Sequence, residues 1–167
     1  MATLQKIFPC LWFDHQAEEA ANFYVGIFKN SRIKKIAHYG EAGHEIHGMP
    51  AGSVMTVSFE LVGQSFTALN GGPTFKFNEA ISLQVDCTSQ KEVDDYWTKL
   101  SAGGDVSAQQ CGWLKDKYGL SWQIVPSILQ EMITDSDHER SQRVMTAMLQ
   151  MKKLNIDALK QAYAGTH

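Results

Sequence analysis

The chain has 167 residues, of which 44% are hydrophobic and 20% are charged, and its formal net charge is −3. These values are typical of a globular protein with one domain, or with two half-domains that share a core. No cluster of Lys or Arg forms a stripe for nucleic acid or an anionic membrane, so we expect neither as a partner. The N-terminus lacks the apolar segment of a signal peptide, and no apolar run reaches the length of a membrane span.

Three cysteines, Cys10, Cys87 and Cys111, lie far apart in the sequence, and no CxxC motif occurs. An odd number of widely separated cysteines does not predict a disulfide framework. We therefore expect a reduced chain in the cytoplasm.

The first half of the chain predicts a strand, a helix and three more strands. An apolar and aromatic run predicts the first strand, with Pro9 at an edge or a bulge. Asp14 opens a helix whose apolar residues recur at helical spacing up to Phe28. A Gly-rich loop at 40–52 interrupts the strands that follow. The predicted strands of this half are residues 4–13, 32–39, 53–61 and 65–70.

The second half repeats this order. A strand at 79–87 precedes a capping box, in which Ser89 and Glu92 open a helix at 90–101. Gly103 and Gly104 end that helix. Three strands then follow, a short one at 105–110 and longer ones at 112–118 and 121–126.

The repeated order predicts an α+β fold built from two βαβββ modules, residues 1–72 and 79–126, within a paired domain at 1–126. The tail at 127–167 predicts helices instead. Ser127 and Gln130 form a second capping box, Asp137 caps a longer helix, and residues 155–163 predict a third. We expect this helical extension to pack on the domain or on the partner in a dimer.

Several segments resemble the PhnB-like branch of the vicinal-oxygen-chelate (glyoxalase–bleomycin resistance) superfamily. They are DHQAEEAANFYVGIF, GQSFTALNGGP, CGWLKDKYGLSWQIVP and VMTAMLQMKKLNIDALKQAYAG. The resemblance covers nearly the whole chain. It implies that each module curls its sheet into half of a cup, that the two halves enclose a pocket, and that the protein is a homodimer.

Metal-using members of the superfamily place His, Gln or Glu ligands on four strands. Local pattern assigns these positions to Ile7, to Phe66 or Ala68, to Ala80 and to Gln123. A divalent ion needs several lone-pair donors, and only the glutamine offers one. The resemblance therefore implies a cup without the usual metal site, and we expect no cofactor.

Alternation in the fifth and last strands indicates which side chains face the cup. Ile81, Leu83 and Val85 suit a face packed on a helix, so the polar residues between them face the cavity. In the last strand, Trp122 and Ile124 face the helix. The predicted ligand-binding residues are Ile7, Phe66, Ala68, Asn70, Ser82, Gln84, Ser121 and Gln123.

Three other features have two interpretations each. His44 and His47 either belong to a metal or acid–base site in a mobile lid, or they are residues of a solvated loop. The HExxH helix motif of zinc enzymes places its two histidines four residues apart, whereas these two are three apart. Cys111 is either a reactive thiol or, as we expect, a buried structural residue. Asn70 serves either a turn or the approach of the backbone to a ligand.

Members of this branch are often labelled 3-demethylubiquinone 3-methyltransferases. A nucleotide-type methyl donor usually sits on a Gly-rich loop of a doubly wound sheet, and no such loop follows a strand here. We therefore expect the protein to bind a small, partly apolar molecule in a metal-free cup. It either only binds this molecule or also catalyses a metal-independent reaction. The sequence does not identify catalytic residues. The alternatives are a non-catalytic binding or sequestering protein, and a metalloenzyme with non-standard ligands from the 40–52 loop.

Overall fold

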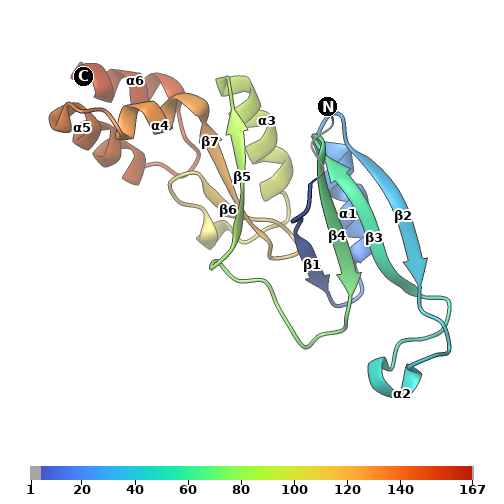
Figure 1. Cartoon of the computed structure of the whole chain (residues 1–167). Coiled ribbons are helices and arrows are strands. Elements are labelled where there is room, and N and C mark those ends of the chain that lie inside the picture. Colours follow the sequence, from blue (N-terminus) through green and yellow to red (C-terminus); the bar gives the residue numbers. More distant parts are fainter. Residues whose placement is uncertain (1–4, 167) are drawn as a thin grey trace. The chain divides into compact units, whose positions relative to one another are not determined.

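The computed structural model describes residues 5–166 and divides the chain into two compact units, residues 1–77 and 78–167. Each unit is an α+β layer with its own sheet (Figure 1). The α+β class predicted from the repeated order of elements is therefore confirmed. Within the described part of the chain, no helix combines the length and apolar character needed to cross a membrane.

The first unit is a four-stranded sheet in the order β1-β4-β3-β2, with β1 parallel to β4 and the other pairs antiparallel. Helix α1 packs along one face of this sheet (Figure 1). The predicted loop at 40–52 contains one short helix, α2. The elements of this unit are β1 (Cys10–Phe13), α1 (Ala17–Ile27), β2 (Arg32–His38), α2 (His44–His47), β3 (Val54–Leu61) and β4 (Gln64–Asn70). The predicted first strand is shorter than expected, and its Leu4 lies outside the described residues.

An aromatic stack joins α1 to the sheet of the first unit. The ring of Tyr24 lies 6.4 Å from that of Phe59, which stacks on Phe66 at 5.3 Å. All three side chains are buried, and burial of each such side chain stabilises the fold by about 1.5–3 kcal/mol. The helix-covered face of β4 is therefore the face of Phe66, Ala68 and Asn70.

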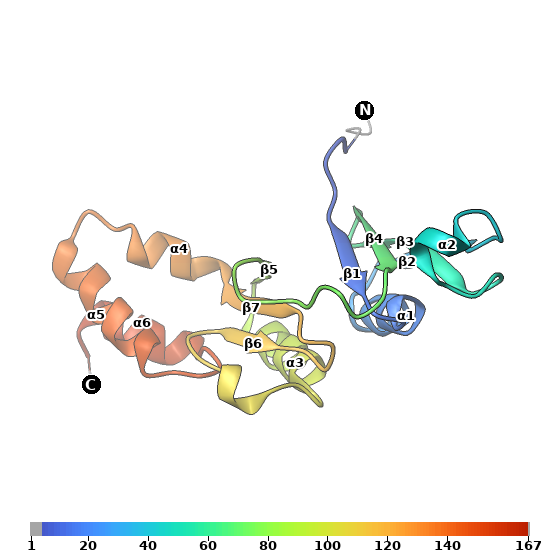
Figure 2. The ribbon, with the colours of Figure 1, turned by 90° about the horizontal axis from the view of Figure 1, so that it is seen from below.

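The second unit is a three-stranded sheet in the order β5-β7-β6, with β5 parallel to β7 and β6 antiparallel to it. Helix α3 packs on the sheet, and α5 and α6 lie side by side (Figure 2). The elements are β5 (Ser82–Cys87), α3 (Gln90–Ser101), the 3-10 turn η1 (Val106–Ala108), β6 (Trp113–Lys115), β7 (Ser121–Pro126), α4 (Ser127–Ile133), α5 (His138–Leu149) and α6 (Ile156–Ala164).

Two local predictions for this unit were wrong. The predicted strand at 105–110 is absent: Val106–Ala108 form a 3-10 turn, because the Asp105 carboxylate accepts a hydrogen bond from the Ser107 amide at 2.8 Å, and Gln110 forms only an isolated bridge with Trp113. Ser127 does not cap α4, because its hydroxyl instead donates to the Cys87 carbonyl at 3.1 Å. The caps at Ser89 and Asp137 are confirmed.

The helical tail packs into the second unit. A core of buried side chains joins α4, α5 and α6, and the linker between α5 and α6 is held by Gln90 of α3. The Gln90 amide donates to the Leu154 carbonyl at 3.2 Å and accepts from the Ile156 amide at 2.8 Å. The fully buried core residues of the tail are Val144, Leu154 and Leu159.

A buried carboxylate shapes the turn between β6 and β7. Asp116 is only 2% exposed, and one of its oxygens accepts from the amides of Tyr118 at 2.9 Å and Leu120 at 3.1 Å. Its other oxygen accepts from the Trp122 indole at 2.9 Å. A carboxylate that receives several donors offsets the cost of its burial. Asp116 therefore fixes both the turn and the face on which Trp122 lies.

We predict that Asp116→Ala lowers the free energy of unfolding by about 2–4 kcal/mol, because it leaves a buried indole donor and two turn amides without their acceptor. Urea denaturation measures this change. Asp95→Ala is the matched control, since Asp95 lies on the exposed face of α3 and forms a solvent-exposed ion pair with Lys91. This variant should lower the free energy of unfolding by about a few tenths of a kcal/mol. Equal losses in the two variants would contradict the assignment.

Candidate functional site

A pocket of about 240 Å³ lies in the second unit, between the sheet and the helical tail. Its floor is a row of side chains across the three strands, because Gln123 of β7 pairs with Gln84 of β5 on one side and with Trp113 of β6 on the other. Asp86 and Val125 form the next row. The walls come from α4 and α5, through Leu129, Gln130, Ile133 and Met148.

One amide of the floor, that of Gln123, is oriented by a neighbouring hydroxyl. Gln123 donates from Nε2 to the Ser82 hydroxyl at 2.8 Å, which leaves its Oε1 available as an acceptor. Gln84 is exposed within the same pocket. Neutral amides of this kind bind and orient a ligand, but they are poor bases at neutral pH.

The structure brings together the four predicted residues of β5 and β7, in the pairs Ser82–Ser121 and Gln84–Gln123. Trp122 and Ile124 lie buried on the opposite face of β7 from Gln123, as the alternation predicted. Ser121 is buried, and its hydroxyl has no hydrogen-bond partner within residues 5–166. It does not line the pocket.

The other four predicted residues belong to the first unit. Ile7 is 89% exposed and precedes β1. Phe66 and Ala68 were expected to face a cavity, but they are buried on the α1 side of their sheet. These two side chains lie on the other face of the sheet than predicted because of how β4 pairs with β3. Phe59 of β3 packs on α1 and lies directly opposite Phe66 of β4, so Phe66 faces α1 as well.

Asn70 joins three elements of the first unit. Its side-chain oxygen accepts from the Ala17 amide at the start of α1 at 2.8 Å, and its Nδ2 donates to the Val54 carbonyl at 3.0 Å. Its own carbonyl accepts from the Tyr39 hydroxyl at 2.6 Å. The contacts of Asn70 are thus those of a structural residue.

Cys111 lines the pocket and is partly exposed, in contrast to the buried position that we expected. It adopts a positive φ of 51°, and Gly112 one of 85°. The two amides donate to the carbonyls of Met151 and Lys152 at 2.8 Å each, so the linker after α5 holds this strained turn. No local signal in the sequence indicates this pairing, because the partners lie forty residues apart.

The positions at which the superfamily resemblance places a metal do not fit one. Ile7, Phe66, Ala68 and Ala80 carry no donor atoms, and Gln123 alone is not a metal site. Nor do three His, Cys, Asp or Glu side chains gather anywhere in residues 5–166 in a way that could hold a metal.

The histidine pair of the 40–52 loop lies on α2. The Nδ1 atom of His47 accepts from the Met49 amide at 3.0 Å, so the ring carries its proton on Nε2, which lies 3.2 Å from the Ala42 carbonyl. The same ring packs against Tyr39 at 4.6 Å. Both ring nitrogens are used within the loop, and this arrangement favours the structural interpretation over a metal site.

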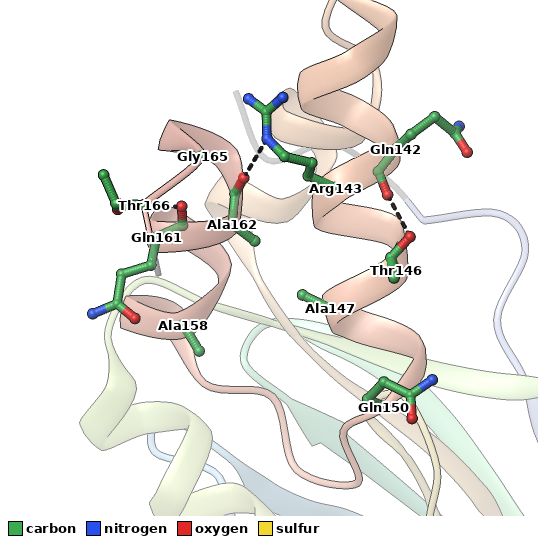
Figure 3. A pocket seen from close by; sticks show the side chains of 10 residues that line it. All are labelled: Gln142, Arg143, Thr146, Ala147, Gln150, Ala158, Gln161, Ala162, Gly165 and Thr166. Carbon is green, nitrogen blue, oxygen red and sulfur yellow. Dashed lines mark hydrogen bonds between the residues drawn. The ribbon is translucent and has the colours of Figure 1, made fainter.

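A larger groove of about 550 Å³ runs between α5 and α6 (Figure 3). Arg143 spans it, and its guanidinium donates to the carbonyls of Ala162 and Tyr163 at 2.9 Å each. The remaining lining is mostly small side chains and glutamines on an open surface. We therefore take the smaller pocket, where polar groups from three strands converge, as the candidate functional site.

Comparisons with known proteins agree with the sequence resemblance. A family model described as 3-demethylubiquinone-9 3-methyltransferase matches residues 5–125. The PhnB protein of Bacillus cereus is 36% identical, with a TM-score of 0.63 over 73% of this chain and 99% of its own. A Pseudomonas aeruginosa protein is 18% identical, with a TM-score of 0.58 over 74% of this chain and 98% of its own. No match was found among curated proteins.

The thiol of Cys87, at the end of β5, has a much higher pKa than an exposed thiol. Burial, with smaller contributions from the carboxylates of Glu92 and Asp86, raises the pKa of Cys87 from 9.0 to about 12. At pH 8 its thiolate fraction is then roughly a thousandfold below that of an unperturbed thiol.

We predict that iodoacetamide labels Cys87 in the native protein at least about a thousandfold more slowly at pH 8 than in the urea-unfolded protein. Peptide mass spectrometry measures both rates. Because the unfolded chain loses this proton first, the contribution of Cys87 to stability should fall as pH rises from 9 towards 12. Native labelling as fast as that of the unfolded protein would show that Cys87 is not buried.

Proposed function

We propose that this chain binds a small, partly apolar molecule in the pocket of its second unit. The chain belongs to the 3-demethylubiquinone-9 3-methyltransferase family, in the PhnB-like branch of the vicinal-oxygen-chelate superfamily. The observation that carries the proposal is the row of Gln84, Gln123 and Trp113 beneath an apolar wall. Apolar enclosure with a few convergent polar groups is the usual composition of a ligand site.

The size of the pocket limits the ligand. Its volume of about 240 Å³ is below the roughly 300–1,000 Å³ of sites for drug-sized molecules. A single aromatic or alicyclic ring with one or two polar substituents fits this space. Its ring would pack on Ile133 and Met148, while a polar substituent would meet the amide oxygen of Gln123.

The family description implies a methyl donor, but the residues present do not fit a nucleotide-type donor bound in the usual way. The connections from β1 to α1 and from β5 to α3, residues 14–16 and 88–89, lack glycine. The sheets have four and three strands with antiparallel neighbours, not the doubly wound parallel order of such sites. We therefore assign no methyl-transfer step to this chain.

Binding, and not a particular reaction, is the function that the pocket supports best. The polar side chains of its lining are three amides, one hydroxyl, one thiol and the exposed carboxylate of Asp86, with no histidine among them. The hydroxyl, that of Ser127, already donates to a backbone carbonyl. These groups suit recognition by hydrogen bonds more than proton transfer at neutral pH.

We predict that benzamide and related single-ring amides raise the melting temperature and that Gln123→Ala weakens their binding about fivefold, the effect of losing one neutral hydrogen bond. Thermal shift and calorimetry measure both. Gln161→Ala is the matched control, since Gln161 is an exposed glutamine outside the pocket. Prior dialysis against a chelator should leave the affinity unchanged.

Two results would contradict this proposal. One is the absence of binding by any single-ring probe to the native protein. The other is binding that Gln123→Ala leaves intact but that chelation abolishes, since that would require a metal. Recovery of the probe unchanged after prolonged incubation would support a binding protein over an enzyme.

A further inference from the structure

We propose that this pocket prefers small organic ammonium ions over neutral or anionic molecules of the same shape. This inference rests on the proposed function and names the ligand class for the same site. It starts from the charges of the lining: Asp86 is its one carboxylate, and no Lys, Arg or His contributes to it. An anion would therefore find no cationic side chain there, whereas an ammonium would find a counter-ion.

The position of Asp86 suits contact with a ligand. It follows Gln84 by two residues on β5, so both side chains project from the same face of the sheet. Asp86 forms no ion pair within residues 5–166. Two lysines of the same unit have carboxylate partners elsewhere: Lys115 pairs with Glu79 and Lys153 with Asp94.

The remaining polar groups of the pocket can accept the other hydrogen bonds of an ammonium ion. Such an ion donates up to three hydrogen bonds and accepts none. The carbonyl oxygens of Gln84, Gln123 and Gln130 are acceptors in the same pocket as the Asp86 carboxylate. The amide nitrogen of Gln123 donates one of its two hydrogen bonds to Ser82, and the amide oxygen is an acceptor for an ammonium.

The indole of Trp113 adds a second attraction for a cation. Trp113 lies beside Gln123 on the floor, and it lines the pocket. A cation over the face of a tryptophan is attracted by the negative face of the ring. The apolar groups of Ile133 and Met148 can cover the hydrocarbon part of the same ligand.

The test compares three probes of one shape at neutral pH: benzylamine, a cation, benzyl alcohol, which is neutral, and benzoate, an anion. Nitrogen–proton correlation spectra report binding at Trp113 and at the side-chain amides of Gln84 and Gln123, and titration gives each affinity. We expect benzylamine to bind about fivefold more tightly than benzyl alcohol, as for an exposed charge pair. Benzoate should bind most weakly.

Asp86→Asn should lower the affinity for benzylamine to that for benzyl alcohol. The affinity for benzyl alcohol itself should not change. Asp157→Asn removes an equal charge from α6, outside the pocket, and should retain the native order. Equal affinities of the three probes for the native protein would overturn the ammonium preference but not the pocket. Failure of all three probes to perturb the pocket resonances would overturn the proposed function as well.

Discussion

The geometry of the candidate site depends on the hydrogen bond from the Trp122 indole to the buried carboxylate of Asp116. Strand residues alternate between two faces, so a shift of one residue would turn every side chain of β7 over. By holding Trp122 on the covered face, Asp116 places Gln123 on the open one. The pairing of β7 with β5 and β6 then aligns Gln123 between Gln84 and Trp113.

Local signals in the sequence predicted the elements well where capping and periodicity agree. Helix α3 begins after Ser89 and ends before Gly103 as expected, because Ser89 accepts from the Glu92 amide at 3.2 Å. The faces of β7 also followed from alternation, since Trp122 and Gln123 differ strongly in polarity. These properties depend on neighbours in the chain, which a single sequence contains.

Features that depend on tertiary contacts were not predictable in the same way. The face of β4 is set by Phe59 across the sheet, so counting along the superfamily pattern placed Phe66 and Ala68 on the other side. The pocket walls come from α4 and α5, whose path back over the sheet has no local signature. Cys111 reaches the pocket because the distant residues 151 and 152 bind its turn.

The most direct test of the account is a crystal structure of the protein soaked with a single-ring probe such as benzamide. We predict difference density above the floor of β5, β6 and β7, with a polar atom of the probe within hydrogen-bond distance of Gln123 Oε1. Density found only in the groove between α5 and α6, or a pocket filled by rearranged side chains, would contradict it.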